Sequence, residues 1–333
     1  MANLIPLDTE RNDRGQILLL AAFALAVSFV VLALVVNSAI FTENLATRED
    51  VAGSHDALDH RYEVETNVER LIQGVNNDSE LDEGDLETSI EQMVEEGAGQ
   101  QASQGRLVSV SYVDSEPGTK IAQDTVRNFT NADDNQGRWN VTDTTVDTDT
   151  VRNFKINVTE PFVDSEWGST PFQLVLNGTD PDEEWVMEID ETSGGDGIEV
   201  TVEHPDYPDE EVCTREDIGE YTIVDVTGAT VDDEPCHALG QLHDGTDMWF
   251  GTGVDSPYRI EFDNSWNIEG TYSFILGTGG VDDNEKIVPV NQQDEGPYYD
   301  DDAIYSADLS YEFYTSAVGY ETDIRVAPGE IPS

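Results

Sequence analysis

Positively charged residues are scarce in this chain of 333 residues. Lysine and arginine together number 15, against 71 aspartates and glutamates, and the formal net charge is −56. Only three of the basic residues are lysines: Lys120, Lys155 and Lys286. Nucleic-acid binding through phosphates requires basic side chains, so this composition excludes a phosphate-neutralising DNA- or RNA-binding surface. The same deficit disfavours attraction to anionic lipid headgroups.

The acidic composition does not imply disorder. Hydrophobic residues make up 38% of the chain and include 5 Trp, 12 Tyr and 11 Phe, whereas disordered acidic chains are poor in aromatics. In roughly 1 M salt the Debye length is only about 3 Å, so a folded domain of this charge would hardly repel itself. The acid-rich, lysine-poor composition resembles that of haloarchaeal proteins. An acidic protein of an ordinary organism is the alternative.

Sequence motifs of catalysis are also lacking. The chain contains no Gly-x-Ser-x-Gly, no His-Glu-x-x-His, and no dinucleotide or phosphate loop after a predicted strand. Its five histidines form no catalytic pattern: His55, His60, His204, His237 and His243. With so many acids, chance carboxylate pairs are expected everywhere and carry no glycosidase signal. We therefore expect no enzyme activity and no cofactor.

Long hydrophobic runs are limited to one, over residues 17–40, which reads ILLLAAFALAVSFVVLALVVNSAI. As a helix it would be about 36 Å long, more than the roughly 30 Å hydrocarbon core of a bilayer. Arg11 and Arg14 precede the run and the next basic residue is Arg48, so the positive-inside rule places the N-terminus in the cytoplasm. We expect a cytoplasmic leader over residues 1–15 and a transmembrane helix over residues 16–42.

A short motif begins this run. Residues 13–18 read DRGQIL and resemble an archaeal type IV prepilin signal, which implies cleavage between Gly15 and Gln16. The stretches RGQILLLAAFALA and NSAIFTENLATRE are also similar to haloarchaeal membrane-anchored, pilin-like surface proteins, a resemblance that brings no biochemical activity. Leu20 departs from the Glu that bacterial major pilins carry at this mature position, which weakens a filament role. An ordinary cleaved signal peptide is the alternative, but its apolar part would span only about 7–15 residues.

Helical periodicity continues beyond the apolar run. Four residues form one stripe with helical spacing: Val64, Val68, Leu71 and Val75. Three further residues could extend it upstream: Val51, Leu58 and Tyr62. A second helix should be capped by Asp82 or Asp85 and end near Gly97. We expect a helical stem and this second helix over residues 43–105, either continuous with the membrane helix or as a separate stalk.

After residue 106 the hydrophobic period changes to two, as in half-buried strands. The alternating residues are Val108, Val110 and Tyr112; Phe154, Ile156 and Val158; Ile198, Val200 and Val202; Tyr258, Ile260 and Phe262; Leu309, Tyr311 and Phe313. The hexapeptide DTVRNF occurs twice, at Asp124–Phe129 and Asp149–Phe154, and suggests a duplicated strand or hairpin. The pattern predicts a mostly antiparallel, sandwich-like extracellular domain over residues 106–333, in one large or two small sandwiches. The expected fold class is α+β, with a long N-terminal transmembrane and stem α-helix before this domain.

Cysteine occurs only twice, as Cys213 and Cys236. In an exported protein such a pair predicts one disulfide. Two free thiols are one alternative. A zinc site that adds His237 and His243 is another, although the spacing matches no recognised finger.

Five Asn-x-Ser/Thr sequons are candidate N-glycosylation sites: Asn77, Asn128, Asn140, Asn157 and Asn177. The acidic loops at residues 282–285 and 300–302 carry oxygen ligands suited to Ca²⁺, but a solvated surface adapted to salt explains them without a metal. No metal site is expected.

These features favour a structural cell-surface protein of a halophilic archaeon, namely a pilin-like subunit or minor pilin of a type IV-pilus-like system. We expect a cytoplasmic N-terminus, an extracellular bulk, and homo- or hetero-oligomers formed through the N-terminal helix. Nucleic acid is not an expected partner. The first alternative is an uncleaved, single-pass envelope or adhesion protein, and the second is an anchored extracellular hydrolase.

Overall fold

The computed structural model describes a chain that is mostly β. The described residues are 25, 28, 29, 32, 33, 55–131, 137–142, 150–160, 170–178, 183–193, 197–216, 219, 221–277, 299–316 and 318–330. Strands make up 50% of the structure and helices 25%. The expected α+β class is therefore wrong. The strands extend far beyond the alternating triplets seen in the sequence, since β1 (Leu107–Asn128) has 22 residues and β13 (Tyr299–Tyr314) has 16.

The prediction of a long N-terminal transmembrane and stem helix is also wrong. The described part of the chain contains two helices of several turns, one over residues 55–76 and α2 (Glu83–Ser103). No helix among the described residues is both long enough and apolar enough to cross a membrane. The helix over residues 55–76 buries a stripe that includes Val64, Val68 and Ile72 and carries charged residues on its other faces, so it is amphipathic rather than uniformly apolar. The junction Gly15–Gln16 and most of residues 16–42 lie outside the described residues.

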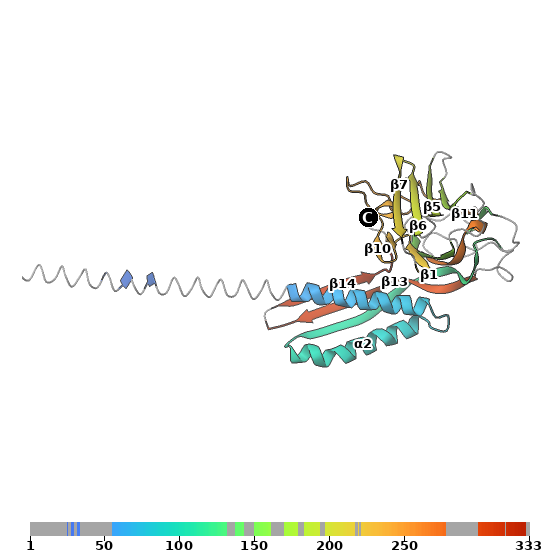
Figure 1. Cartoon of the computed structure of the whole chain (residues 1–333). Coiled ribbons are helices and arrows are strands. Elements are labelled where there is room, and N and C mark those ends of the chain that lie inside the picture. Colours follow the sequence, from blue (N-terminus) through green and yellow to red (C-terminus); the bar gives the residue numbers. More distant parts are fainter. Residues whose placement is uncertain are drawn as a thin grey trace, which may run out of the picture.

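Two antiparallel sheets form the body of the molecule (Figure 1). The eight-stranded sheet has the order β10 (Glu234–Pro235), β9 (Thr230–Val231), β8 (Thr222–Asp225), β3 (Val151–Glu160), β12 (Glu269–Gly277), β1, β13 and β14 (Gly319–Val326). The six-stranded sheet has the order β2 (Trp139–Asn140), β11 (Arg259–Asp263), β4 (Phe172–Asn177), β5 (Glu184–Glu191), β6 (Gly197–His204) and β7 (Tyr207–Glu216).

The sheets enclose one sandwich core, in which aromatic residues from both sheets meet. The Phe129 ring, just after β1, packs edge-on to Phe172 of β4 in the other sheet at 5.5 Å between centroids. Within the eight-stranded sheet, the ring centroids of Phe154 of β3 and Phe274 of β12 lie 4.7 Å apart. All four side chains are fully buried. Sheet-on-sheet packing with alternating inward residues is how such strands remove their apolar faces from water.

A second, smaller core lies between the helices and the other end of the eight-stranded sheet. There β1 pairs with β13, and β13 with β14, in a ribbon that extends beyond the sandwich (Figure 1). Val68 and Ile72 of the first helix pack in one cluster with Leu309 and Phe313 of β13, and all four are fully buried. Burying each such side chain is worth roughly 1.5–3 kcal/mol. This packing holds the helix over residues 55–76 along the sheet.

A capping box starts α2. The Asp82 carboxylate accepts hydrogen bonds from Gly84 N at 2.8 Å and Asp85 N at 3.2 Å, and the Asp85 carboxylate accepts from Asp82 N at 3.0 Å. These bonds satisfy backbone donors that the helix leaves open. Asp82 is therefore the cap, and the helix continues past Gly97 to Ser103.

Candidate functional site

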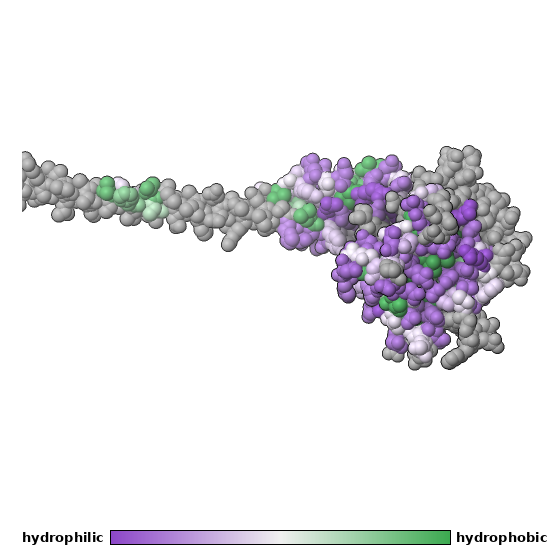
Figure 2. Space-filling model, turned by 90° about the horizontal axis from the view of Figure 1, so that it is seen from above, coloured by the Kyte–Doolittle hydropathy of each residue, from purple (hydrophilic) through white to green (hydrophobic). Residues whose placement is uncertain are grey.

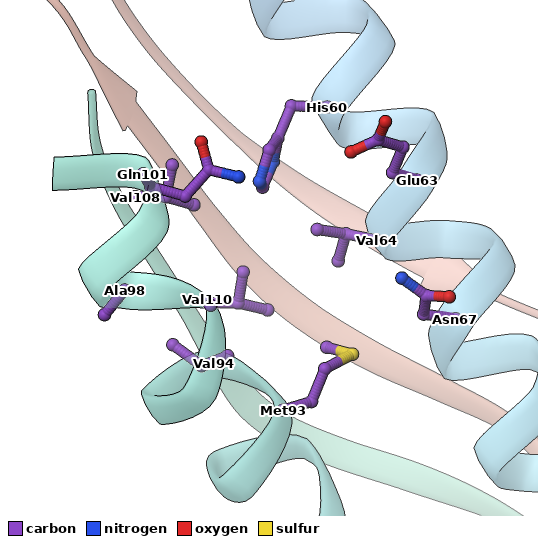
Figure 3. A pocket seen from close by; sticks show the side chains of 11 residues that line it. His60, Glu63, Val64, Asn67, Met93, Val94, Ala98, Gln101, Val108 and Val110 are labelled. Atoms are coloured by element: carbon purple, nitrogen blue, oxygen red, sulfur yellow. The ribbon is translucent and has the colours of Figure 1, made fainter. Parts of the chain in front are cut away.

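A groove between the two helices is the candidate site. His60, Glu63, Val64 and Asn67 line it from the first helix, and the floor is formed by Val108 and Val110 of β1 (Figure 3). The α2 wall consists of Met93, Val94, Gly97, Ala98 and Gln101. The groove has a volume of about 150 Å³. It can therefore hold one or two side chains rather than a large ligand.

Small residues keep the groove open on the α2 side. Gly97 and Ala98 line this side, and a Cβ atom added at Gly97 would meet no atom within 4 Å. The buried contacts of α2 come from Leu86 and Ile90 in its first half, so its second half covers the sheet less tightly. Met93 and Val94, further along the same helix, are only partly buried and line the groove.

His60 fixes one end of the groove. Its Nδ1 lies 3.1 Å from the oxygen of the Tyr311 hydroxyl, and that hydroxyl donates to the Ala57 carbonyl at 3.3 Å. Across the groove, Gln101 faces His60 (Figure 3), and none of the described residues forms a hydrogen bond with its buried Oε1 atom. With its apolar floor, the imidazole and the unpartnered Gln101 Oε1 atom, the groove is suited to bind an apolar side chain together with a peptide N–H.

We expect His60 to make the protein less stable in mild acid. Burial lowers the pKa of His60, Arg106 lowers it further, and Glu63 opposes the shift. The unfolded chain then binds the proton more tightly, so stability falls as the pH drops through the ordinary histidine pKa of about 6.5. Between about pH 7 and pH 5, the free energy of unfolding should fall less in His60→Gln than in the wild type. Denaturant titrations in molar salt measure this.

His243→Gln, at an exposed position, is the matched control for the loss of a histidine side chain. His204, whose pKa burial also lowers, contributes a slope common to all three proteins. Equal pH dependence in His60→Gln and the wild type would contradict the prediction.

The two cysteines are joined. Cys213 of β7 and Cys236, next to the short helix η2 (His237–Leu239), form a disulfide with Cα atoms 5.7 Å apart. Disulfide sulfurs are not available as the thiolates that bind zinc. His237 and His243 stack with ring centroids 6.1 Å apart. The described residues contain no group of three or more His, Cys, Asp or Glu that could hold a metal ion.

Thiol titration checks this bond. Protein unfolded in denaturant without reductant should show no reactive thiol, and two should appear after reduction. Two thiols without reductant would contradict the disulfide.

The sequons are spread over the fold. Asn77 lies in the turn between the helices, Asn128 at the end of β1, Asn140 in β2, Asn157 in β3 and Asn177 at the end of β4. The acidic loop at residues 282–285 lies outside the described residues, as does residue 149 of the second DTVRNF copy. Asp301 and Asp302 belong to β13 and pair in register with Lys120 and Thr119 of β1.

One buried arginine was not predicted from the sequence. The Arg152 side chain is 4% exposed, and its guanidinium lies 3.8 Å from the centre of the Tyr305 ring and 2.7 Å from Glu330. Glu330 also contacts Arg325 at 3.0 Å. This Arg152 cluster (Arg152, Tyr305, Arg325 and Glu330) fastens the C-terminal segment to β3. Its members are far apart in sequence, and the one sequence pattern that includes Arg152 is the repeated Arg-Asn-Phe.

Comparison with known proteins yields one match. Residues 11–162 match a family of unknown function, DUF7261. The matched part includes the apolar run, both helices and strands β1 to β3, and it ends before β4. No curated protein and no solved structure shows significant similarity to the chain.

Proposed function

We propose that this chain is a structural subunit of the cell surface, pilin-like in organisation, of a halophilic archaeon. In this proposal the N-terminal apolar run holds the chain at the cell membrane, and the sandwich with its helix layer lies outside the cell. The proposal includes cleavage between Gly15 and Gln16, as the prepilin-like motif implies.

One contrast carries the proposal. In the apolar run, Leu25, Phe29 and Leu32 are 57–61% exposed. The folded domain, in contrast, presents a mostly hydrophilic surface, and Figure 2 displays both regions. Apolar side chains gathered in this way require lipid or other protein chains as a cover. The acidic composition of the chain suits a domain that works in concentrated salt, where its charges are screened.

The packing of the first helix on the sheet connects the apolar run mechanically to the folded domain. That helix follows the apolar run in sequence, and its buried stripe lies on β13 through Val68 and Ile72. A pull on the N-terminal segment is therefore passed to the sheet, as a subunit held by its N-terminus requires. The groove lies along the same helix, and we propose that it binds a side chain of a neighbouring subunit.

The mass of the mature protein, isolated from the surface of the cells that make it, tests this function. The pilin-like proposal predicts a chain that starts at Gln16. A surface protein that retains residues 1–15 would favour the uncleaved envelope or adhesion protein. A chain that starts beyond residue 40 would contradict both, because it would have lost the apolar run.

A further inference from the structure

We propose that Asn77 carries an N-linked oligosaccharide, and that the sequons at Asn128, Asn140 and Asn157 do not. The inference rests on the proposed extracellular position of the domain. The structure separates these sequons by what their side chains already bind and by how much of each sequon can be reached.

Asn77 presents its whole sequon at the surface. Asn77, Asp78 and Ser79 are all exposed, in the turn that joins the first helix to α2. Its backbone N–H donates to the Gln73 carbonyl at 3.1 Å, which fixes the residue at the helix end. A transferase can therefore reach the asparagine amide and the serine hydroxyl without unfolding the domain.

The amide of Asn77 is also oriented. Lys120 Nζ lies 3.4 Å from Asn77 Oδ1 and donates to the Asn76 carbonyl at 2.8 Å. Within its described residues the structure records no hydrogen bond from Asn77 Nδ2. N-glycosylation uses the nitrogen and leaves the carbonyl oxygen in place, so the lysine contact is compatible with the product.

The side-chain amide of the neighbouring Asn76, in contrast, is fully engaged in hydrogen bonds to the backbone. Its Nδ2 donates to the Ile304 carbonyl at 2.9 Å, and its Oδ1 accepts from Ile304 N at 2.8 Å. Asn76 is buried and extends the hydrogen bonding of β13, whereas Asn77 points to solvent. At the end of the helix, Asn76 therefore has a structural role, whereas the side-chain amide nitrogen of Asn77 is accessible for modification.

The side-chain amide of Asn128 is already hydrogen-bonded within the fold. Asn128 Nδ2, the atom that a glycan would need, donates to the Trp266 carbonyl at 2.7 Å and to the Ile268 carbonyl at 3.3 Å. A sugar on this nitrogen replaces one of its two hydrogens and so removes at least one of the bonds that join β1 to the segment before β12.

Two further sequons, at Asn140 and Asn157, are closed by burial of part of the sequon. Asn140 is exposed, but Val141 and Thr142 of its sequon are fully buried. Asn157 lies on β3 between β8 and β12, and its Oδ1 atom is buried. Neither sequon can enter a transferase site while the sandwich is folded.

The surface beside Asn77 can receive sugar. A hollow of about 530 Å³ is lined by Asn76, Asn77, Asp78, Ser79, Lys120, Asp124 and Asp301. Its volume is within the roughly 300–1,000 Å³ of small-molecule sites. Carboxylates accept hydrogen bonds from sugar hydroxyls, and the lysine can donate to ring oxygens.

The transfer needs one co-reactant, a lipid-linked oligosaccharide. The bond between Asn77 Nδ2 and sugar C1 forms while the C1–O bond to the lipid phosphate breaks. The proton lost by the amide leaves with the lipid phosphate. No oxidant or reductant is involved.

Peptide mass mapping of the full chain, purified from the cells that make it, tests the inference. The Asn77 peptide should carry an oligosaccharide mass, and peptides with Asn128, Asn140 and Asn157 should have their unmodified masses. Asn77→Gln and Ser79→Ala should each lose the added mass. Ser79→Thr, which keeps the sequon, should retain it, and Asn128→Gln should leave the mass of the Asn77 peptide unchanged.

Two failures are distinguishable. An unmodified Asn77 peptide together with a glycan on Asn128, Asn140 or Asn157 would overturn the site assignment and leave the extracellular position intact. If no peptide is modified, protease treatment of intact cells decides what has failed. Release of the domain would overturn the glycan alone, whereas a domain protected from protease would overturn the proposed location and the glycan together.

Discussion

Replacing Ile72 by Ala should lower the free energy of unfolding by about 2–5 kcal/mol. Ile72 is fully buried between the first helix and the β1–β13–β14 ribbon. The substitution removes buried methyl groups and leaves a cavity. Unfolding by denaturant, followed in molar salt by circular dichroism, measures the loss.

The sign of the change in the free energy of unfolding distinguishes a helix packed on the sheet from a free stalk. Alanine is a better helix former than isoleucine, so the same change in an isolated stalk would slightly stabilise the helix. Leu58→Ala is the matched control, because Leu58 lies on the same helix but is 50% exposed, and it should change stability by less than about 0.5 kcal/mol. Equal effects of the two substitutions would contradict the packing of this helix on the sheet.

Replacing Glu330 by Gln should cost about 2–3 kcal/mol. The Arg152 guanidinium is buried and stays charged, so loss of its carboxylate partner leaves an uncompensated charge. Removing one partner of a fully buried pair typically costs about 3–5 kcal/mol. The expected loss is smaller here because the Glu330 side chain is 52% exposed. The Glu330→Gln substitution also removes the carboxylate that contacts both Arg152 and Arg325.

A double-mutant cycle attributes the loss to the pair. Arg152→Met with Glu330→Gln should be less destabilised than the sum of the two single changes, because the double variant buries no unpaired charge. Glu312→Gln, at an exposed position of β13, serves as the control and should be nearly neutral. Strict additivity would contradict a coupled Arg152 cluster.

Periodicity predicted which residues of the strands are buried better than it predicted the fold class. Ile156, Val200 and Phe262 are fully buried, as their alternation indicated. The arrangement of the strands was not readable, because β1 pairs with β12 and β13, more than 140 residues later in the chain. Local patterns carry no information about such distant partners.

The first helix illustrates how hydrophobicity alone misleads. Leu58 and Tyr62 were expected to extend its stripe, but they are 50% and 70% exposed. Ala57 and His60 take the buried positions instead, because a small side chain fits close to the sheet and the imidazole pairs with Tyr311. The polar contact that closes the groove has no signal in a hydropathy pattern.

The position of the folded domain relative to the cell is the central claim. Antibodies raised against residues 55–330 should label intact cells in their native salt, and the label should follow the surface material released by shearing. Labelling that appears only after the cells are lysed would contradict a surface subunit.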